Sequence, residues 1–158
     1  MATLNKKRIL VTYIEAGFGH ITTANSIANA IEALQDPNIE VIRKDIFSED
    51  PTLRKTEKRF IKEVKIANMF PWYNRIQMAA THIFGIHNSL PIVVSTVFRR
   101  IRNIYLSKLE EIRPDIIIDT HYLTSFFATQ YRYKIDPHVK VITYNPDNNV
   151  HNWWNLRV

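Results

Sequence analysis

The amino-acid sequence predicts an α/β fold built on a doubly wound parallel sheet. The first observation is that short apolar segments rich in β-branched residues, typical of strands buried on both faces, alternate with segments of helical periodicity. The second is that polar or glycine-containing segments follow three of these strands directly. Ligands bind beyond the carboxyl ends of the strands in such sheets, so the alternation also predicts where a site should lie.

The first strand–helix–strand unit occupies the first 46 residues. Lys7 to Ile14 is predicted to form a buried strand, which ends at the break Ala16–Gly19. Apolar residues at spacings of three and four then predict an amphipathic helix from Ile21 to Leu34. It stops before Pro37, because proline cannot continue a helix. Ile39 to Ile46 is the second predicted strand, joined by a right-handed crossover.

The middle third is predicted to be helical. A basic helix runs from Pro51 to about Asn68 and is interrupted at Phe70–Tyr73. A second helical segment covers roughly Tyr73 to Phe84. Gly85 to Pro91 forms a connection, and a long helix follows from Pro91 to Ile112.

The last third returns to strand–helix alternation. Asp115 to Thr120 is a short buried strand introduced by Pro114, and Leu123 to Lys134 is predicted to be a helix. Val139 to Tyr144 is the fourth strand. The end, Asn145 to Val158, is polar and aromatic without periodicity. Three segments therefore follow strands as candidate sites: 15–20, 120–124 and 145–154.

The composition fits one domain, expected over residues 1–158. Hydrophobic residues make up 46% of the chain, enough for a core. The absence of cysteine removes disulfides and thiolate metal sites and fits a reducing compartment. The most apolar later stretch, Leu90 to Phe98, is far shorter than the ~20 residues that span a bilayer. We therefore expect a soluble or peripheral protein.

The net charge of +6 is unevenly distributed. Residues 1–50 carry 5 basic and 7 acidic side chains, residues 51–113 carry 12 and 4, and residues 114–158 carry 4 of each. The whole excess lies in the middle third. A basic patch attracts phosphate, whether on nucleic acid or on an anionic membrane, although a solvated lysine-rich helix face gives the same composition.

The first turn between strand and helix, Glu15 to His20, is the first candidate site. Its glycines, Gly17 and Gly19, allow a tight turn and the close approach of a ligand, and the helix behind them points free N–H groups at that ligand. The helix dipole favours a neutral imidazole at His20, which could act as a general base. The alternative is a histidine that only caps the helix.

Three other kinds of site are disfavoured. A dinucleotide-binding turn requires a third glycine, which is missing here, although Asp45 lies suitably at a strand end. A P-loop would need Gly-Lys-Ser/Thr. The histidines have no zinc-binding spacing with a nearby carboxylate, so no metal site is predicted.

Three motifs resemble one family. The first is Gly17-Phe18-Gly19-His20 with the following Thr-Thr-Ala-Asn-Ser-Ile-Ala-Asn-Ala-Ile. The second is Arg113-Pro114-Asp115-Ile-Ile-Ile-Asp-Thr-His121, and the third is Val141-Ile-Thr-Tyr144 with His151 and Trp153-Trp154. They resemble the monogalactosyldiacylglycerol synthase and processive diacylglycerol glucosyltransferase family. More distantly, they resemble the enzyme that adds N-acetylglucosamine to the lipid-linked peptidoglycan precursor.

The resemblance implies the amino-terminal half of a GT-B fold, in which two Rossmann-like domains face each other across a cleft. By this resemblance His20 would be the catalytic base that deprotonates the acceptor hydroxyl in an inverting transfer, with no metal or cofactor. The implied substrate-binding residues are Gly17, Phe18, Gly19, Thr22, His121, Tyr122, Pro146, His151 and Trp153. The departures are Phe18, where the family often has glycine or asparagine, and Tyr144, where many members have an acid. Glu15 could orient His20 or repel phosphate.

In that family the nucleotide sugar is a co-substrate held mainly by the carboxyl-terminal domain. We therefore expect this domain to need such a glycosyltransferase domain as its partner, in the same or a separate chain. On its own, it should show negligible transfer. The other implied partners are a lipid acceptor and anionic membrane lipids, at a cytoplasmic, peripheral location on the inner face of the membrane.

The middle third supplies a candidate membrane surface, because cations attract anionic headgroups and tryptophan and tyrosine favour headgroup depth. Its predicted contacts are Lys58, Lys62, Lys65, Phe70, Trp72, Tyr73, Arg99 and Arg100. The alternative for the three aromatic residues is packing in the core. Nucleic acid is not expected as a partner, because the topology is none of the usual nucleic-acid-binding folds.

The sequence thus predicts the acceptor- and membrane-binding domain of an inverting glycosyltransferase. It would move a hexose from a nucleotide sugar to a diacylglycerol-type lipid. The alternative is a non-catalytic lipid-binding or scaffolding module with the same fold.

Overall fold

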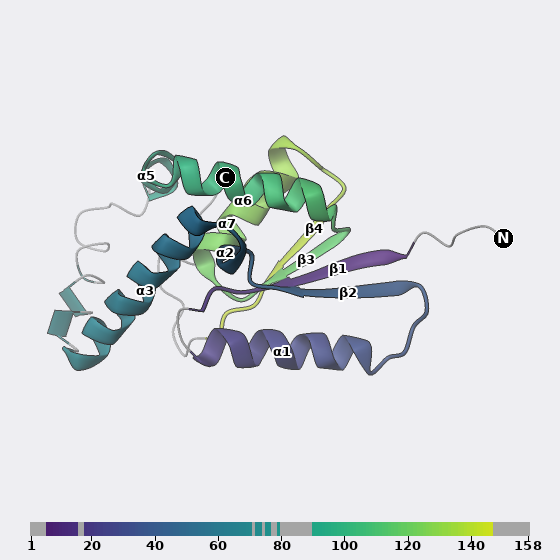
Figure 1. Cartoon of the computed structure of the whole chain (residues 1–158), viewed down its shortest axis with the longest axis horizontal. Helices are drawn as coiled ribbons and strands as arrows, with labels where there is room; N and C mark the ends of the chain where they lie inside the picture. The colour runs from purple at the N-terminus through teal and green to yellow at the C-terminus, as the bar shows by residue number, and fades with distance from the viewer. Residues whose placement is uncertain are drawn as a thin grey trace.

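A computed structural model describes residues 6–15, 18–70, 72–73, 75–76, 79 and 90–146. Four strands and six helices of this part of the chain carry labels in Figure 1. The strands are β1 (Lys7–Thr12), β2 (Ile39–Lys44), β3 (Ile116–Asp119) and β4 (Lys140–Thr143). The helices are α1 (Phe18–Glu32), α2 (Ile46–Glu49), α3 (Pro51–Met69), α5 (Leu90–Val97), α6 (Arg99–Ile112) and α7 (Tyr122–Lys134).

The strands form one parallel sheet in the order β2-β1-β3-β4. Strand β1 lies inside the sheet, and its residues from Ile9 to Thr12 are buried. The edge strand β4 is largely exposed, with Ile142 50% accessible. The predicted α/β, Rossmann-like parallel sheet is therefore confirmed.

Helices cover both faces of the sheet (Figure 1). On one face, α1 packs Ala24 and Ala28 against Ile9 and Val11 of β1. On the other face lies the larger core, built from β1 and β3 together with α2, α3, α5, α6 and α7. Helix α1 connects β1 to β2 at one edge of the sheet, whereas α7 connects β3 to β4 at the other edge. Because such crossovers are right-handed, the two helices lie on opposite faces of the sheet.

Several boundaries differ from the sequence prediction. The second strand ends at Lys44 rather than Ile46, because the Asp45 side chain accepts the N–H of Phe47 and begins the short helix α2. The long helix expected from Pro91 to Ile112 is two helices separated at Phe98. Most residues just before this break are β-branched, a type with lower helix propensity.

The predicted helical segment 73–84 and the connection 85–91 lie largely outside the described residues. Within the described part of the chain, no helix has both the length and the apolar composition needed to cross a membrane.

Candidate functional site

The candidate site lies where β1 and β3 end side by side. Thr12, the last residue of β1, is in register with Asp119, the last residue of β3. The chain leaves these two strands towards opposite edges of the sheet. A switch point of this kind leaves a crevice at the carboxyl edge, and the segments that follow both strands line it. The described parts of two of the three segments that the sequence nominated, 15–20 and 120–124, therefore meet here, through His20 and Thr120.

His20 is the third residue of α1, and its ring is half-buried. Its Nδ1 lies 2.5 Å from the carbonyl oxygen of Thr120. Because a carbonyl oxygen can only accept a hydrogen bond, Nδ1 carries the proton and Nε2 of the neutral ring is an acceptor. Among the described residues, no hydrogen-bond partner of Nε2 is found. The ring thus presents a basic nitrogen that is held in one orientation.

The alternative that His20 only caps α1 is not what the structure shows. The ring lies inside the first turn, and its Nδ1 bonds to the segment after β3, 100 residues away along the chain. The Thr120 hydroxyl in turn donates to the carbonyl oxygen of His20 at 3.2 Å. Glu15 is not the orienting group, because the Thr120 carbonyl fills that place.

Asp119 holds the turn that carries Thr120. Its carboxylate is fully buried and accepts the N–H of His121 at 2.9 Å and the hydroxyl of Thr124 at 2.6 Å. Burial raises the pKa of Asp119 to about 7, although these hydrogen bonds act in the opposite direction. The buried carboxyl therefore fixes the segment whose carbonyl orients His20.

His121 is 3% exposed and lies beside His20. The two rings meet edge to face with their centroids 5.1 Å apart, and the His121 ring stacks on Tyr122 at 4.4 Å. Its Nδ1 accepts the N–H of Leu123 at 3.3 Å and caps α7. The predicted substrate contact is thus a buried residue that caps α7 and packs against the His20 ring.

The remaining predicted substrate-binding residues are only partly described. Gly19 is exposed, and a Cβ at this position would meet nothing within 4 Å, so open space adjoins it. Its helical backbone does not require glycine. Thr22 is exposed, whereas Tyr122 and Pro146 are half-buried. Gly17, His151, Trp153 and the side chain of Phe18 lie outside the described residues. Their role in binding stays a prediction.

Three carboxylates form an acidic cluster beside the site. Glu15, Asp45 and Glu57 place carboxylate oxygens within 4.8 Å of one another, and Glu57 accepts the N–H of Glu15 at 2.9 Å. Burial, the charge of Glu57 and a hydrogen bond with Glu57 raise the pKa of Asp45 to about 7. Such a group can bind a cation or share a proton, and the hydrogen bond between Asp45 and Glu57 favours a shared proton. This cluster links α3 to the turn after β1.

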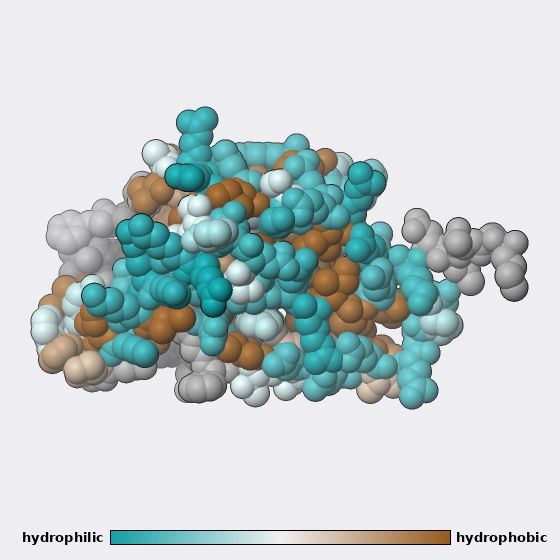
Figure 2. Space-filling view, viewed as in Figure 1, coloured by the Kyte–Doolittle hydropathy of each residue, from teal (hydrophilic) through white to brown (hydrophobic). Residues whose placement is uncertain are grey.

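The predicted membrane surface lies on α3 and beyond its end. Lys58, Lys62 and Lys65 are exposed. Phe70 and Trp72 are 45% and 60% exposed, so these two aromatic residues do not pack in the core; Tyr73 is half-buried. Figure 2 shows hydrophobic atoms gathered among hydrophilic ones at the end of the molecule where α3 finishes. The described exposed residues there include Val64, Ile66, Met69 and Ile76.

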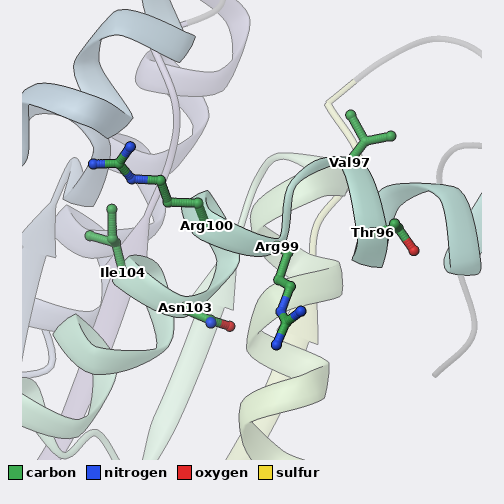
Figure 3. Close-up of a pocket in the computed structure, with 6 residues that line it drawn as sticks. All are labelled: Thr96, Val97, Arg99, Arg100, Asn103 and Ile104. Carbon is green, nitrogen blue, oxygen red and sulfur yellow. The ribbon is translucent and has the colours of Figure 1, made fainter.

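The predicted contacts Arg99 and Arg100 border a shallow hollow at the junction of α5 and α6. It is lined by Thr96, Val97, Arg99, Arg100, Asn103 and Ile104. Figure 3 shows the two arginine side chains extending in different directions, Arg100 alongside Ile104 and Arg99 alongside Asn103. Both are exposed, and neither forms an ion pair with a described residue. They are two separate surface cations rather than a clamp for one anion.

Four contributors to the site were missed by sequence reasoning: Glu57, Asp119, the Thr120 carbonyl, and Phe60, whose ring centroid lies 6.1 Å from that of His121. Glu57 carried a signal, as a single acid within the basic stretch from Arg54 to Lys62. Asp119 also carried one, because it ends an apolar strand just before Thr-His. A backbone carbonyl carries no sequence signal, and Phe60 is one of many apolar residues on its helix.

Comparisons with protein-family models, with curated proteins and with solved structures found no significant match to this chain. The functional assignment therefore depends on the geometry of the site and of the surface around it.

Proposed function

We propose that this chain is the acceptor- and membrane-binding domain of an inverting glycosyltransferase, the amino-terminal half of a GT-B enzyme. The complete enzyme transfers a hexose from a nucleotide sugar to a diacylglycerol-type lipid. The observation that carries the proposal is the imidazole of His20, whose Nδ1 donates to the Thr120 carbonyl and whose Nε2 remains an acceptor at the switch point of the sheet.

In this proposal Nε2 of His20 removes the proton from the acceptor hydroxyl. The resulting oxygen nucleophile attacks the anomeric carbon of the sugar, the new glycosidic C–O bond forms, and the nucleoside diphosphate leaves with the electrons of the broken bond. The imidazolium is stabilised because its Nδ1–H already bonds to a carbonyl oxygen. A second domain, in the same or a separate chain, binds the nucleotide sugar.

The surface supports an acceptor that resides in a membrane. Exposed lysines on α3 can attract anionic headgroups, and the exposed Phe70 and Trp72 suit the headgroup depth. The protein would then bind peripherally, at the inner face of the membrane.

The test is His20→Ala in the domain joined to its nucleotide-sugar-binding partner, with a diacylglycerol acceptor and nucleotide hexoses as donors. General-base catalysis contributes about 100-fold or more, so kcat should fall by at least that factor. Binding to vesicles should be unchanged, since the ring is not part of the membrane surface.

Two outcomes would count against the proposal. Turnover that survives His20→Ala removes the base role and favours the non-catalytic lipid-binding module. Efficient transfer by the isolated chain contradicts the need for a second domain. Ser26→Ala is a matched control at an exposed position of the same helix, outside the predicted site, and its kcat should stay within a few-fold of the unchanged chain.

A further inference from the structure

We propose that Phe60 and Phe98, which adjoin the buried His121 ring, form a wall along which one acyl chain of the lipid acceptor lies. This inference rests on the proposed function, because it assigns the path by which the acceptor hydroxyl reaches His20. We call Phe60, Phe98 and His121 the aromatic strip.

The strip is continuous from the candidate base outward. His121 meets the His20 ring at a centroid distance of 5.1 Å, and Phe60 meets the His121 ring at 6.1 Å. Phe98 stacks on Phe60 at 6.3 Å with an interplanar angle of 27°. Each step is an aromatic contact of ordinary length. The ring contacts thus run from His20, beyond the carboxyl edge of the sheet, to the junction of α5 and α6.

The two phenylalanines are only partly buried. Phe60 and Phe98 pack against the larger core from outside and keep part of their surface accessible. Helix α5, which precedes Phe98, exposes two further apolar side chains, Val97 at 68% and Ile92 at 69%. Apolar and aromatic side chains therefore extend from the exposed surface at α5 towards the half-buried His20.

The chemistry of the strip selects a hydrocarbon chain as its occupant. Phe60 and Phe98 offer no hydrogen-bond donor or acceptor, so a peptide backbone lying on them would lose hydrogen bonds to water without replacement. A hydrocarbon chain instead gains by burial. The polar end of the path is at His20, which matches the hydroxyl end of a diacylglycerol.

The helices that carry the strip are those proposed to touch the membrane. Phe60 lies in α3, between the exposed Lys58 and Lys62, and Phe98 immediately precedes Arg99 and Arg100. A lipid drawn partly out of a bilayer at this surface can leave its headgroup region near these cations while one chain follows the rings. In this proposal the membrane surface and the residues around His20 belong to a single acceptor site.

The experiment uses diacylglycerol probes with a photoreactive diazirine in one acyl chain, either next to the ester or midway along the chain. The full chain is irradiated with each probe in phosphatidylcholine–phosphatidylglycerol vesicles, and labelled peptides are mapped by mass spectrometry. The near-ester probe should label the segment around His121. The mid-chain probe should label Phe60 and Phe98, and excess unlabelled diacylglycerol should suppress both signals.

Variants make the test quantitative. Phe60→Ala and Phe98→Ala should each lower the competable labelling about tenfold, as loss of one ring contact implies. Phe60→Leu keeps an apolar side chain of similar reach and should retain labelling within a few-fold, even if Phe60→Ala is poorly folded. Tyr133→Ala removes an exposed aromatic residue of α7 that lies outside the strip, and it should change nothing.

Labelling confined to exposed residues such as Trp72, or labelling that unlabelled diacylglycerol does not suppress, overturns the inference. The result is separable from the test of catalysis. If His20→Ala keeps its turnover while the strip is labelled, the proposed base fails and the lipid path stands. If His20→Ala loses turnover but the strip is not labelled, only the path fails.

Discussion

At the scale of single residues, the site depends on hydrogen bonds that fix ring orientation. His20 donates from Nδ1 to the Thr120 carbonyl, and the Thr120 hydroxyl donates back to the His20 carbonyl. Asp119 holds the segment that contains Thr120 by accepting from the His121 N–H and the Thr124 hydroxyl. The orientation of one imidazole is thus determined by the segment at the end of β3 rather than by its own helix.

The capping role of His121 leads to a prediction about stability. Both His121→Ala and His121→Asn remove the ring. Only asparagine can still accept the N–H of Leu123, because its side chain carries an amide oxygen, and asparagine is among the best N-cap residues. His121→Asn should therefore be about 1 kcal/mol more stable than His121→Ala. Urea denaturation of the two variants measures the difference, and equal midpoints would show that the cap contributes nothing.

At the scale of elements, α3 connects the membrane surface to the site. Its outer side carries exposed lysines, whereas Glu57 and Phe60 reach inward to the acidic cluster and the His121 ring. The helix begins with Asp50, whose side chain accepts the N–H groups of Thr52 and Leu53 at 2.7 and 3.1 Å, followed by Pro51 in the first turn. This start is well formed, because proline at the first position has no N–H to lose.

Removing the cap of α3 should be visible in thermal unfolding. The pKa of Asp50 is lowered mainly by the hydrogen bond that its carboxylate accepts from the N–H of Leu53. Hydrogen bonds from Thr52 and the positive charge of Arg100 lower it further by smaller amounts. A lowered pKa means that the ionised cap stabilises the fold above pH 4 and that this contribution is lost as the pH falls below it. Asp50→Ala should thus lower Tm by a few degrees at pH 7 and by less at pH 3. Asp50→Asn keeps an acceptor, so it should show little change at either pH.

The lysines of α3 give a prediction for membrane binding. Replacing Lys58, Lys62 and Lys65 by glutamine should weaken binding to anionic vesicles, since each cation contributes about 1 kcal/mol near the surface. The affinity at low salt should fall roughly 100-fold. The matched control replaces three exposed lysines elsewhere, Lys7, Lys134 and Lys140. Vesicle co-sedimentation over a range of salt measures both variants. An equal loss in the two would mean that only net charge matters.

At the scale of the whole molecule, the fold contains two carboxyl groups, those of Asp45 and Asp119, whose pKa values are raised to about 7. Burial is the main cause for both Asp45 and Asp119, and the charge of Glu57 adds to it for Asp45. These groups belong to the carboxyl ends of β2 and β3, where the parallel sheet brings segments from distant parts of the chain together. The same arrangement that brings the site residues together therefore makes stability depend on pH.

The sign of that dependence follows from proton binding. Between pH 4 and 7 the folded protein holds protons on these carboxyls that the unfolded chain has already released, so the free energy of unfolding should fall as the pH rises through this range. For Asp119 the difference corresponds to at most about 4 kcal/mol. Asp119→Asn should flatten the pH profile in chemical denaturation, whereas Asp36→Asn, a change at an exposed loop carboxylate, should leave it unchanged. A profile that rises towards pH 7 would contradict the assignment.

The sequence by itself determined the alternation of strands and helices, the parallel sheet and the position of His20 at the first switch from strand to helix. These features are local, since the periodicity of apolar residues states which side of each element faces the core. The ends of the elements were not predicted correctly in two places. The break at Phe98 depends on a single turn between two helices, and the early end of β2 depends on the cap that Asp45 provides to α2. The end of the chain from residue 147 lies outside the described residues, so the predicted roles of His151 and Trp153 stay predictions.

Only the tertiary structure decided which groups meet. The bond between His20 and the Thr120 carbonyl, the cluster of Glu15, Asp45 and Glu57, and the stacking of Phe60 on Phe98 all join residues from different elements. The tertiary structure also decided that Phe70 and Trp72 are exposed, whereas the sequence allowed either exposure or packing in the core. The physical reason is that the periodicity of apolar residues shows which side of a helix or strand is buried, but not which other element packs against that side. The order of the strands and the winding of the chain bring those faces together.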